Sequence, residues 1–263
     1  MEPSARHLLC WLGAVVCICA TSAGVPADET ADSAQQFRIA FSANSSIYVI
    51  DPDGSGLKRL STGTTRSLAW SPDGRKIAFL SAFEQDMEVL GKYDLAFHVF
   101  MYVMDASGKN QQRVTTTPLV LFQWSPDGRK VVFQSSYEDP KHKGNEGWRS
   151  SAIYVMNADG EDQKRLTPVD GSDAFPSWSP DGSEIAFCSN RNGNMDVYVM
   201  NSDGSNKRQL TTGNASGTFP IWSPDGKEIA FASSRPEMLT SIHLIMADGT
   251  NERHISDNAS PLA

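Results

Sequence analysis

The chain has 263 residues, which is enough for one large β domain or two ordinary ones, and 40% of its residues are hydrophobic. Its formal net charge is −8 at pH 7. A surface that tracks nucleic-acid phosphates is therefore not expected, because such surfaces are basic.

An apolar segment near the N-terminus has the features of a secretory signal. Residues 8–20 form an uninterrupted apolar run, which follows Arg6 and precedes the small residues Ser22 and Ala23. Thirteen residues are too few to cross a bilayer, which takes roughly 20, although a retained anchor is the alternative. We predict a signal peptide over residues 1–23 and a polar linker over residues 24–36. Cys188 would then be the one cysteine left, without a disulfide partner.

The rest of the chain is built from copies of one unit. The sequence W-S-P-D-G begins at Trp70, Trp124, Trp178 and Trp222, at intervals of 54, 54 and 44 residues. A second half, Y-V-(I/M) followed by an x-D-G turn, recurs at Tyr48, Tyr102, Tyr154 and Tyr198, and in altered form at Leu244. A fixed period near 45 residues indicates a repeat architecture.

Each copy is predicted to form four short strands. Within S-P-D-G, proline presets the backbone, aspartate bonds back to the main chain, and glycine takes the left-handed position of a tight turn. In the second strand Ile185 and Phe187 point one way, while Ala186 and Cys188 point the other. Both faces are apolar, so each sheet is expected to lie between two others. We predict an all-β fold over residues 37–263, a β-propeller of four-stranded antiparallel blades with about five repeats.

The repeat motif is interpreted as structural. Its tryptophans are expected to wedge between blades, because each would bury a large apolar surface there. Counted from residue 37, the copies contain 19 strands, and the first copy lacks a first strand. Either residues 258–263 supply it or the chain is part of a larger, six-bladed ring. The structural motif comprises Trp70, Asp73, Gly74, Trp124, Asp127, Gly128, Trp178, Asp181, Gly182, Trp222, Asp225 and Gly226.

Two copies carry insertions between their second and third strands, at about residues 82–97 and 137–150. Antiparallel order places these loops on the same face as the connections between blades. Aromatic and arginine side chains on such loops are typical interface anchors, although they can also cover the blade ends. The predicted protein-binding face comprises Phe83, Tyr93, Phe97, Tyr137, Trp148, Arg149, Arg191 and Arg235.

The string W-S-P-D-G-x-x-I-A-F followed by S-x-R-x-G-x-x-D resembles the repeat of TolB-type propellers. The fourth copy has the complete loop signature, Ser189, Arg191, Gly193 and Asp196, which would allow an Arg–Asp bond inside the loop. The resemblance implies export to the periplasm or beyond, and binding to an envelope protein such as a peptidoglycan-associated lipoprotein. The chain differs from TolB in having five repeats rather than six blades, and only a linker before them.

The sequence contains none of the common catalytic or cofactor-binding motifs. The chain has no G-x-S-x-G, H-E-x-x-H, C-x-x-C, phosphate-binding loop or dinucleotide fingerprint, and its histidines lack ligand spacing. The calcium-loop-like stretch at residues 51–56 lacks the final glutamate and is interpreted as a turn. We therefore predict a non-enzymatic scaffold without metal or cofactor. The alternatives are a channel enzyme similar to oligogalacturonate lyases, which use a histidine-rich metal site, and a propeller fragment of a larger protein.

Overall fold

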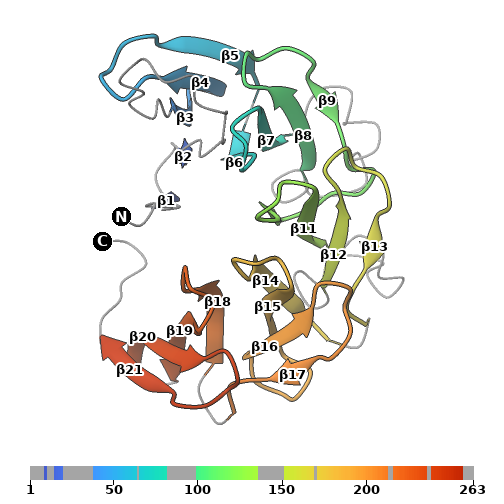
Figure 1. Cartoon of the computed structure of the whole chain (residues 1–263), viewed down its shortest axis with the longest axis vertical. Coiled ribbons are helices and arrows are strands. Elements are labelled where there is room, and N and C mark those ends of the chain that lie inside the picture. The colour runs from blue at the N-terminus through green and yellow to red at the C-terminus, as the bar shows by residue number, and fades with distance from the viewer. Residues whose placement is uncertain are drawn as a thin grey trace, which may run out of the picture. The chain divides into compact units, whose positions relative to one another are not determined.

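The computed structural model describes residues 9–10, 15–19, 38–63, 65–81, 99–135, 151–168, 171–212, 216–235 and 238–256. These residues form strands and turns, and none of them is helical. The chain divides into two compact units, Met1–Pro118 and Leu119–Ala263, and each is described by itself (Figure 1).

The first unit contains two antiparallel sheets, with strand orders β1-β2-β3-β4-β5 and β6-β7-β8-β9. Their strands are β1 (Leu9–Cys10), β2 (Val15–Cys19), β3 (Arg38–Ala43), β4 (Ser46–Ile50), β5 (Lys58–Thr62), β6 (Thr65–Trp70), β7 (Lys76–Ser81), β8 (Phe100–Asp105) and β9 (Gln112–Arg113).

The second unit contains three antiparallel sheets, each with four strands in chain order. These are the third, fourth and fifth sheets of the protein. Their strands are β10 (Leu121–Trp124), β11 (Lys130–Ser135), β12 (Ala152–Asn157), β13 (Lys164–Arg165), β14 (Asp173–Trp178), β15 (Glu184–Ser189), β16 (Asp196–Asn201), β17 (Arg208–Gln209), β18 (Ser216–Trp222), β19 (Glu228–Arg235), β20 (Met238–Met246) and β21 (Arg253–Ser256).

The predicted division of each copy into four strands is confirmed, and β3 to β21 account for the 19 strands expected. The sequence did not anticipate β2. It pairs antiparallel with β3, with Val16 opposite Phe41 and Ile18 opposite Ile39, and so takes the position that the first strand holds in the other sheets. These are residues of the predicted signal peptide, whose cleavage stays a prediction.

The Ser-Pro-Asp-Gly turns have the expected hydrogen bonds. In the third sheet Ser125 Oγ donates to Asp127 Oδ1 (2.6 Å), the backbone N–H of Arg129 donates to the same oxygen (3.0 Å), and that of Lys130 donates to Ser125 Oγ (2.9 Å). Gly128 takes the left-handed conformation, with φ of 70°. The same serine–aspartate bond recurs at Ser71, Ser179 and Ser223. These hydrogen bonds satisfy the turn internally, which supports its structural interpretation.

Neighbouring sheets in one unit pack a small-residue face against a bulky face. Between the fourth and fifth sheets, a cluster joins Ala186, Val197, Val199 and Leu210 to Trp222, Ile229, Phe231 and Ile245. Equivalent clusters join the first sheet to the second and the third to the fourth. Trp70, Trp178 and Trp222 lie in these clusters between sheets, and all four motif tryptophans are only 5–8% exposed. Burying about 200 Å² per indole corresponds to at most about 5 kcal/mol each.

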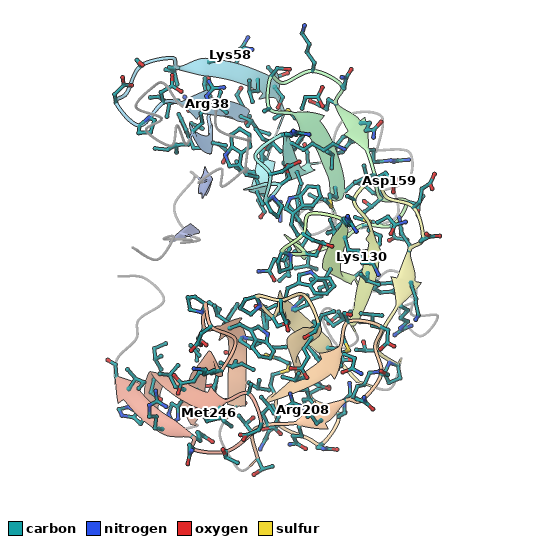
Figure 2. The ribbon with its side chains drawn as sticks, viewed as in Figure 1. Arg38, Lys58, Lys130, Asp159, Arg208 and Met246 are labelled. Atoms are coloured by element: carbon teal, nitrogen blue, oxygen red, sulfur yellow. The ribbon has the colours of Figure 1, made fainter. Side chains whose placement is uncertain are left out.

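A basic side chain on the last strand links each of three sheets to the next. Lys58 Nζ donates to the backbone carbonyl of Ser107 (3.0 Å), and Lys164 Nζ donates to that of Asp203 (3.1 Å). Arg208, labelled in Figure 2 with Lys58, donates to the carbonyl of Ala247. These bonds give the basic residue of the K-R-L-T segment a structural role, which is to tie a sheet to the x-D-G turn of its neighbour.

The predicted start of the Y-V-(I/M) segment in the fifth copy, at Leu244, is wrong by one residue. Phe231 pairs with His243 across β19 and β20, as Phe187 pairs with Tyr198 across β15 and β16. His243, rather than Leu244, therefore occupies the tyrosine position of the fifth copy.

Candidate functional site

The first strands of the fourth and fifth sheets share an unusual backbone conformation. Phe175 and Phe219 each lie three residues before the motif tryptophan and directly before a proline, with φ of 55° and 54°. Both strands have a register shift at this point, between Ala174 and Ser177 in β14 and at the matching positions in β18. Bulky residues rarely adopt this left-handed region, and β-bulges often re-aim side chains next to functional sites.

Side chains of the preceding sheet hold the bulge of β14 in place. Gln134 Oε1 accepts the backbone N–H of Phe175 (3.2 Å), and Gln123 Oε1 accepts that of Trp178 (2.8 Å). In the fifth sheet the backbone of Phe219 bonds to the sulfur of Cys188, which stands at the position of Gln134. At the bulge, these backbone N–H groups do not pair with the neighbouring strand, and the side-chain bonds satisfy them instead.

Cys188 is confirmed as a buried free thiol. Burial raises its pKa far above the usual value, and this outweighs the hydrogen bond from Phe219, which lowers it. A thiol held neutral in this way is inert as a nucleophile, so its role is packing.

The two phenylalanine rings contact each other; Phe219 is exposed and Phe175 is half-buried. Their centroids are 4.0 Å apart with an interplanar angle of 38°. Phe219 is 57% exposed, and Ile221, two residues further along β18, is 64% exposed. We call Phe175 and Phe219 the aromatic pair; it offers a firmly held apolar surface on two adjacent strands, of the kind that binds partners.

A charged cluster lies beside the start of β14. Arg191 donates through Nη2 to Asp173 Oδ1 (2.9 Å) and through Nε to Ser189 Oγ (2.8 Å). Its guanidinium also lies over the ring of Tyr198, 5.0 Å from the centroid. The carboxylate of Asp173 is almost fully buried, and its Oδ2 finds no hydrogen-bond donor among the described residues. Arg191 thus neutralises a buried charge.

The expectation of an Arg–Asp bond inside the loop of the fourth copy is wrong. Arg191 pairs with Asp173 and not with Asp196. Asp196 instead accepts hydrogen bonds from Thr211 Oγ1 (3.0 Å) and Gln209 Nε2 (2.9 Å). Burial raises the pKa of Asp196 against the effect of these two bonds. The aspartate that pairs with Arg191 lies 18 residues before it, on another strand, where the loop signature gives no sign of it.

Most of the predicted binding face lies outside the described residues. Of the two members that fall within them, Arg191 has the contacts above, and Arg235 ends β19 with its side chain undescribed. The binding role of this face therefore stays a prediction. The members outside the described residues are Phe83, Tyr93, Phe97, Tyr137, Trp148 and Arg149.

The aromatic pair was missed at the sequence level. A signal was present, since the dipeptide F-P recurs three residues before the tryptophan in the fourth and fifth copies. What could not be seen is the positive φ at both positions and the contact between the two rings.

The described part of the chain contains no group of three or more His, Cys, Asp or Glu that could hold a metal ion. Two histidines do come together: the rings of His243 and His254 lie 5.4 Å apart, edge to face. His243 Nδ1 lies 3.0 Å from Glu252 Oε1, and its Nε2 lies 3.1 Å from Ser241 Oγ. Among the described residues there is also no helix with the length and hydrophobicity of a membrane span.

Comparison with known proteins decides the family. The TolB beta propeller domain model matches residues 123–261, more than half of the chain. The chain belongs to this family.

Two curated relatives match shorter segments. The chain is 37% identical over 73 residues to dipeptidyl-peptidase 5 of Porphyromonas gingivalis, which covers 28% of this chain and 10% of the relative. It is 32% identical over 97 residues to the Tol-Pal system protein TolB of Alcanivorax borkumensis, covering 35% of this chain and 20% of the relative. The matched segments are thus a small part of both relatives.

Solved structures confirm the predicted fold class. A putative TolB from Agrobacterium tumefaciens is 23% identical with a TM-score of 0.63, covering 84% of this chain and 76% of that one. An oligogalacturonate lyase in complex with manganese is 16% identical with a TM-score of 0.62, covering 84% of this chain and 62% of the lyase. At such identities the likeness concerns the fold alone, an all-β propeller architecture.

Proposed function

We propose that this TolB-family propeller is an exported, non-enzymatic scaffold that binds another protein of the cell envelope. The observation that carries the proposal is the aromatic pair, in which Phe219 is 57% exposed although its backbone is held by the neighbouring sheet. Exposed apolar side chains on a rigid support are what protein interfaces use as anchors.

The polar groups nearby support a scaffold more than a catalyst. Arg191 is engaged with buried Asp173, Asp196 accepts from Thr211 and Gln209, and Cys188 is buried and neutral. A general acid, base or nucleophile must instead face the space where a substrate would lie. The predicted loop residues Trp148 and Arg149 are proposed as further anchors for the same partner.

The class of partner follows from the resemblance to TolB-type propellers. An envelope protein, with a peptidoglycan-associated lipoprotein as the first candidate, would meet the protein in the periplasm or after secretion. The apolar segment at residues 8–20 supports export.

The test has two stages. Tagged protein is used to capture partners from a cell-envelope extract, and the dissociation constant of each retained protein is then measured with purified components. Loss of an anchor costs about 2 kcal/mol or more, about a thirtyfold weaker affinity, so Phe219→Ser and Trp148→Ala should show that loss. Leu57→Ser is the matched control, because Leu57 is also exposed (60%) but lies in the first unit. Equal loss with the control variant, or no saturable binding by folded protein, would refute the scaffold.

A second candidate, an enzyme acting on a carbohydrate or peptide in the central channel, is favoured by one specific observation. The buried oxygen Asp173 Oδ2 has no hydrogen-bond donor among the described residues, although such atoms are normally paired. Turnover of oligogalacturonate or dipeptide substrates, abolished by Asp173→Asn and retained by the Phe219→Ser variant, would establish that function in place of the scaffold.

A further inference from the structure

Arg191, in the loop between β15 and β16, is held in place by its neighbours. Its backbone N–H and its Nε both donate to Ser189 Oγ, at 3.3 and 2.8 Å, and its Nη2 donates to Asp173 Oδ1 at 2.9 Å. The guanidinium also lies over the rings of Phe187 and Tyr198, 5.6 and 5.0 Å from their centroids. These contacts fix the side chain before any ligand binds, which lowers the entropy that binding costs.

The pairing of Arg191 with Asp173 uses one nitrogen and one oxygen. Arginine–carboxylate pairs are frequently bidentate, with two parallel N–H···O bonds. Here, among the described residues, Asp173 Oδ2 finds no donor and Arg191 Nη1 finds no acceptor. The side chain of Asp173 is 1% exposed, whereas that of Arg191 is 22% exposed. Part of the arginine therefore remains accessible to a second acceptor.

A second cation lies close to Arg191. Lys207 is an exposed residue directly before β17, and its Nζ donates to the backbone carbonyl of Gly204 (Figure 1). Its pKa is lowered, first by partial loss of hydration and then by the positive charge of Arg191, which acts on it more strongly than the opposing charges of Asp173 and Asp203. Two like charges at short distance destabilise each other, and an anion beside both relieves this. We call Arg191 and Lys207 the basic site.

Given the proposed scaffold function, on which this inference rests, we propose that the basic site binds a carboxylate of the partner protein, the side chain of an aspartate or glutamate. Arg191 would supply its remaining N–H groups and Lys207 its ammonium, which are donors that suit a carboxylate. The rings of Phe187 and Tyr198 already contact the guanidinium, so the site offers charge and donors rather than an open ring face. Because the chain has a net charge of −8, an acidic partner is repelled by most of it, and this contact would fix where the partner docks.

The test titrates the full chain with hexaglutamate, acetylated and amidated so that only its side chains carry charge, and with hexaglutamine as the neutral control. The Nε–H resonance of Arg191 is identified by its absence from the Arg191→Met/Asp173→Asn variant. It should shift with hexaglutamate and not with hexaglutamine, and binding should weaken as salt is added.

Variants of the two cations measure what each contributes. Arg191→Met/Asp173→Asn should bind hexaglutamate about tenfold more weakly, because a charge-assisted pair is lost, and Lys207→Met about threefold more weakly. Lys227→Met is the matched control and should bind as wild type, because Lys227 is also an exposed lysine of the second unit but lies beside Asp225 in another turn. Circular dichroism checks the fold, and exposed Lys207 can be replaced even if the double variant does not fold.

Three results would overturn the inference. One is an Arg191 resonance that does not shift, or a Lys207→Met variant that binds hexaglutamate as tightly as wild type. Another is tighter binding of hexagalacturonate than of hexaglutamate, which would indicate an acidic polysaccharide instead. The third is a captured envelope protein whose affinity falls with Phe219→Ser but not with the basic-site variants, which would leave the scaffold function standing. Hexaglutamate bound at the site of a protein that captures no envelope partner would refute the scaffold function and keep the carboxylate site.

Discussion

The fourth and fifth sheets have the same strand order and the same turns, but residues at equivalent positions differ in burial. Val199 in the fourth sheet is fully buried under the fifth, whereas the equivalent Leu244 is half-buried although it is larger and as apolar. Burial in a repeat protein is thus set by the neighbouring repeat more than by the residue itself. An equivalent apolar position is core in one copy and half-buried in the next.

The two sheets also differ in charge at the start of the first strand. The fourth sheet has Asp173 paired with Arg191, while Gly217 occupies the aspartate position in the fifth. At the position equivalent to Asp173, Arg235 therefore has no carboxylate. Of these two sheets, only the fourth has a buried carboxylate that needs an arginine to offset its desolvation.

The largest effect should come from placing a charge on the covered face. Val199→Asp would bury a carboxylate without a partner and should lower the free energy of unfolding by at least about 4 kcal/mol. Leu244→Asp should cost about 1–2 kcal/mol, because the new carboxylate can reach water. Urea denaturation of both variants at low protein concentration measures the difference. Equal losses would mean that the two faces are equally covered.

Removing the arginine of the charged cluster should have the next largest effect. Arg191→Met leaves the carboxylate of Asp173 buried and unpaired, which should cost about 3 kcal/mol. Arg235→Met should change stability by less than about 0.5 kcal/mol, because position 217 is glycine. The double variant Arg191→Met/Asp173→Asn should recover part of the loss in a double-mutant cycle. No recovery would show that the arginine acts through packing alone.

Acid should weaken both sheets through their turn aspartates. Hydrogen bonds from the preceding serine and from the backbone hold the pKa of Asp181 and of Asp225 below the usual value. Their stabilisation is therefore complete above about pH 4 and is lost as pH falls through the lowered folded-state pKa. Asp181→Asn and Asp225→Asn should each give a flatter decline of stability between about pH 4 and 2.

Asp196 provides a control of opposite sign for this experiment. Because burial raises its folded-state pKa, protonation relieves a cost, and this offsets part of the acid loss. Asp196→Asn should make the acid decline steeper in the fourth sheet. Unfolding followed at a series of pH values would contradict the assignment if the asparagine variants at positions 181 and 196 moved the profile in the same direction.

A small change in stability is expected at the aromatic pair. Phe219→Gly relieves a left-handed phenylalanine, worth about 1 kcal/mol, and loses a ring contact of similar size. Stability should therefore stay within about 1 kcal/mol of wild type, while partner binding is lost. Phe231→Ala, in the same sheet but 3% exposed, should cost about 3–5 kcal/mol. A loss of several kcal/mol in the free energy of unfolding for Phe219→Gly would show instead that this ring contributes to the core.

The sequence by itself determined the repeat, the four-strand unit and the turn chemistry, and the structure has all three. Each depends on residues close together in the chain, such as Ser125 and Asp127, or on a strict alternation such as Ile185, Ala186 and Phe187. Local hydrogen bonding and the two-residue strand period fix them without reference to distant parts.

Only the tertiary structure decided which carboxylate Arg191 pairs with, that Phe175 and Phe219 meet, and how deeply equivalent positions such as Val199 and Leu244 are buried. These outcomes join positions on different strands or different sheets, where spacing along the chain carries no information. They also depend on backbone angles, such as the positive φ of Phe219, that the residue type itself disfavours. A repeated sequence sets what each face is made of, while its position in the stack sets what that face is free to bind.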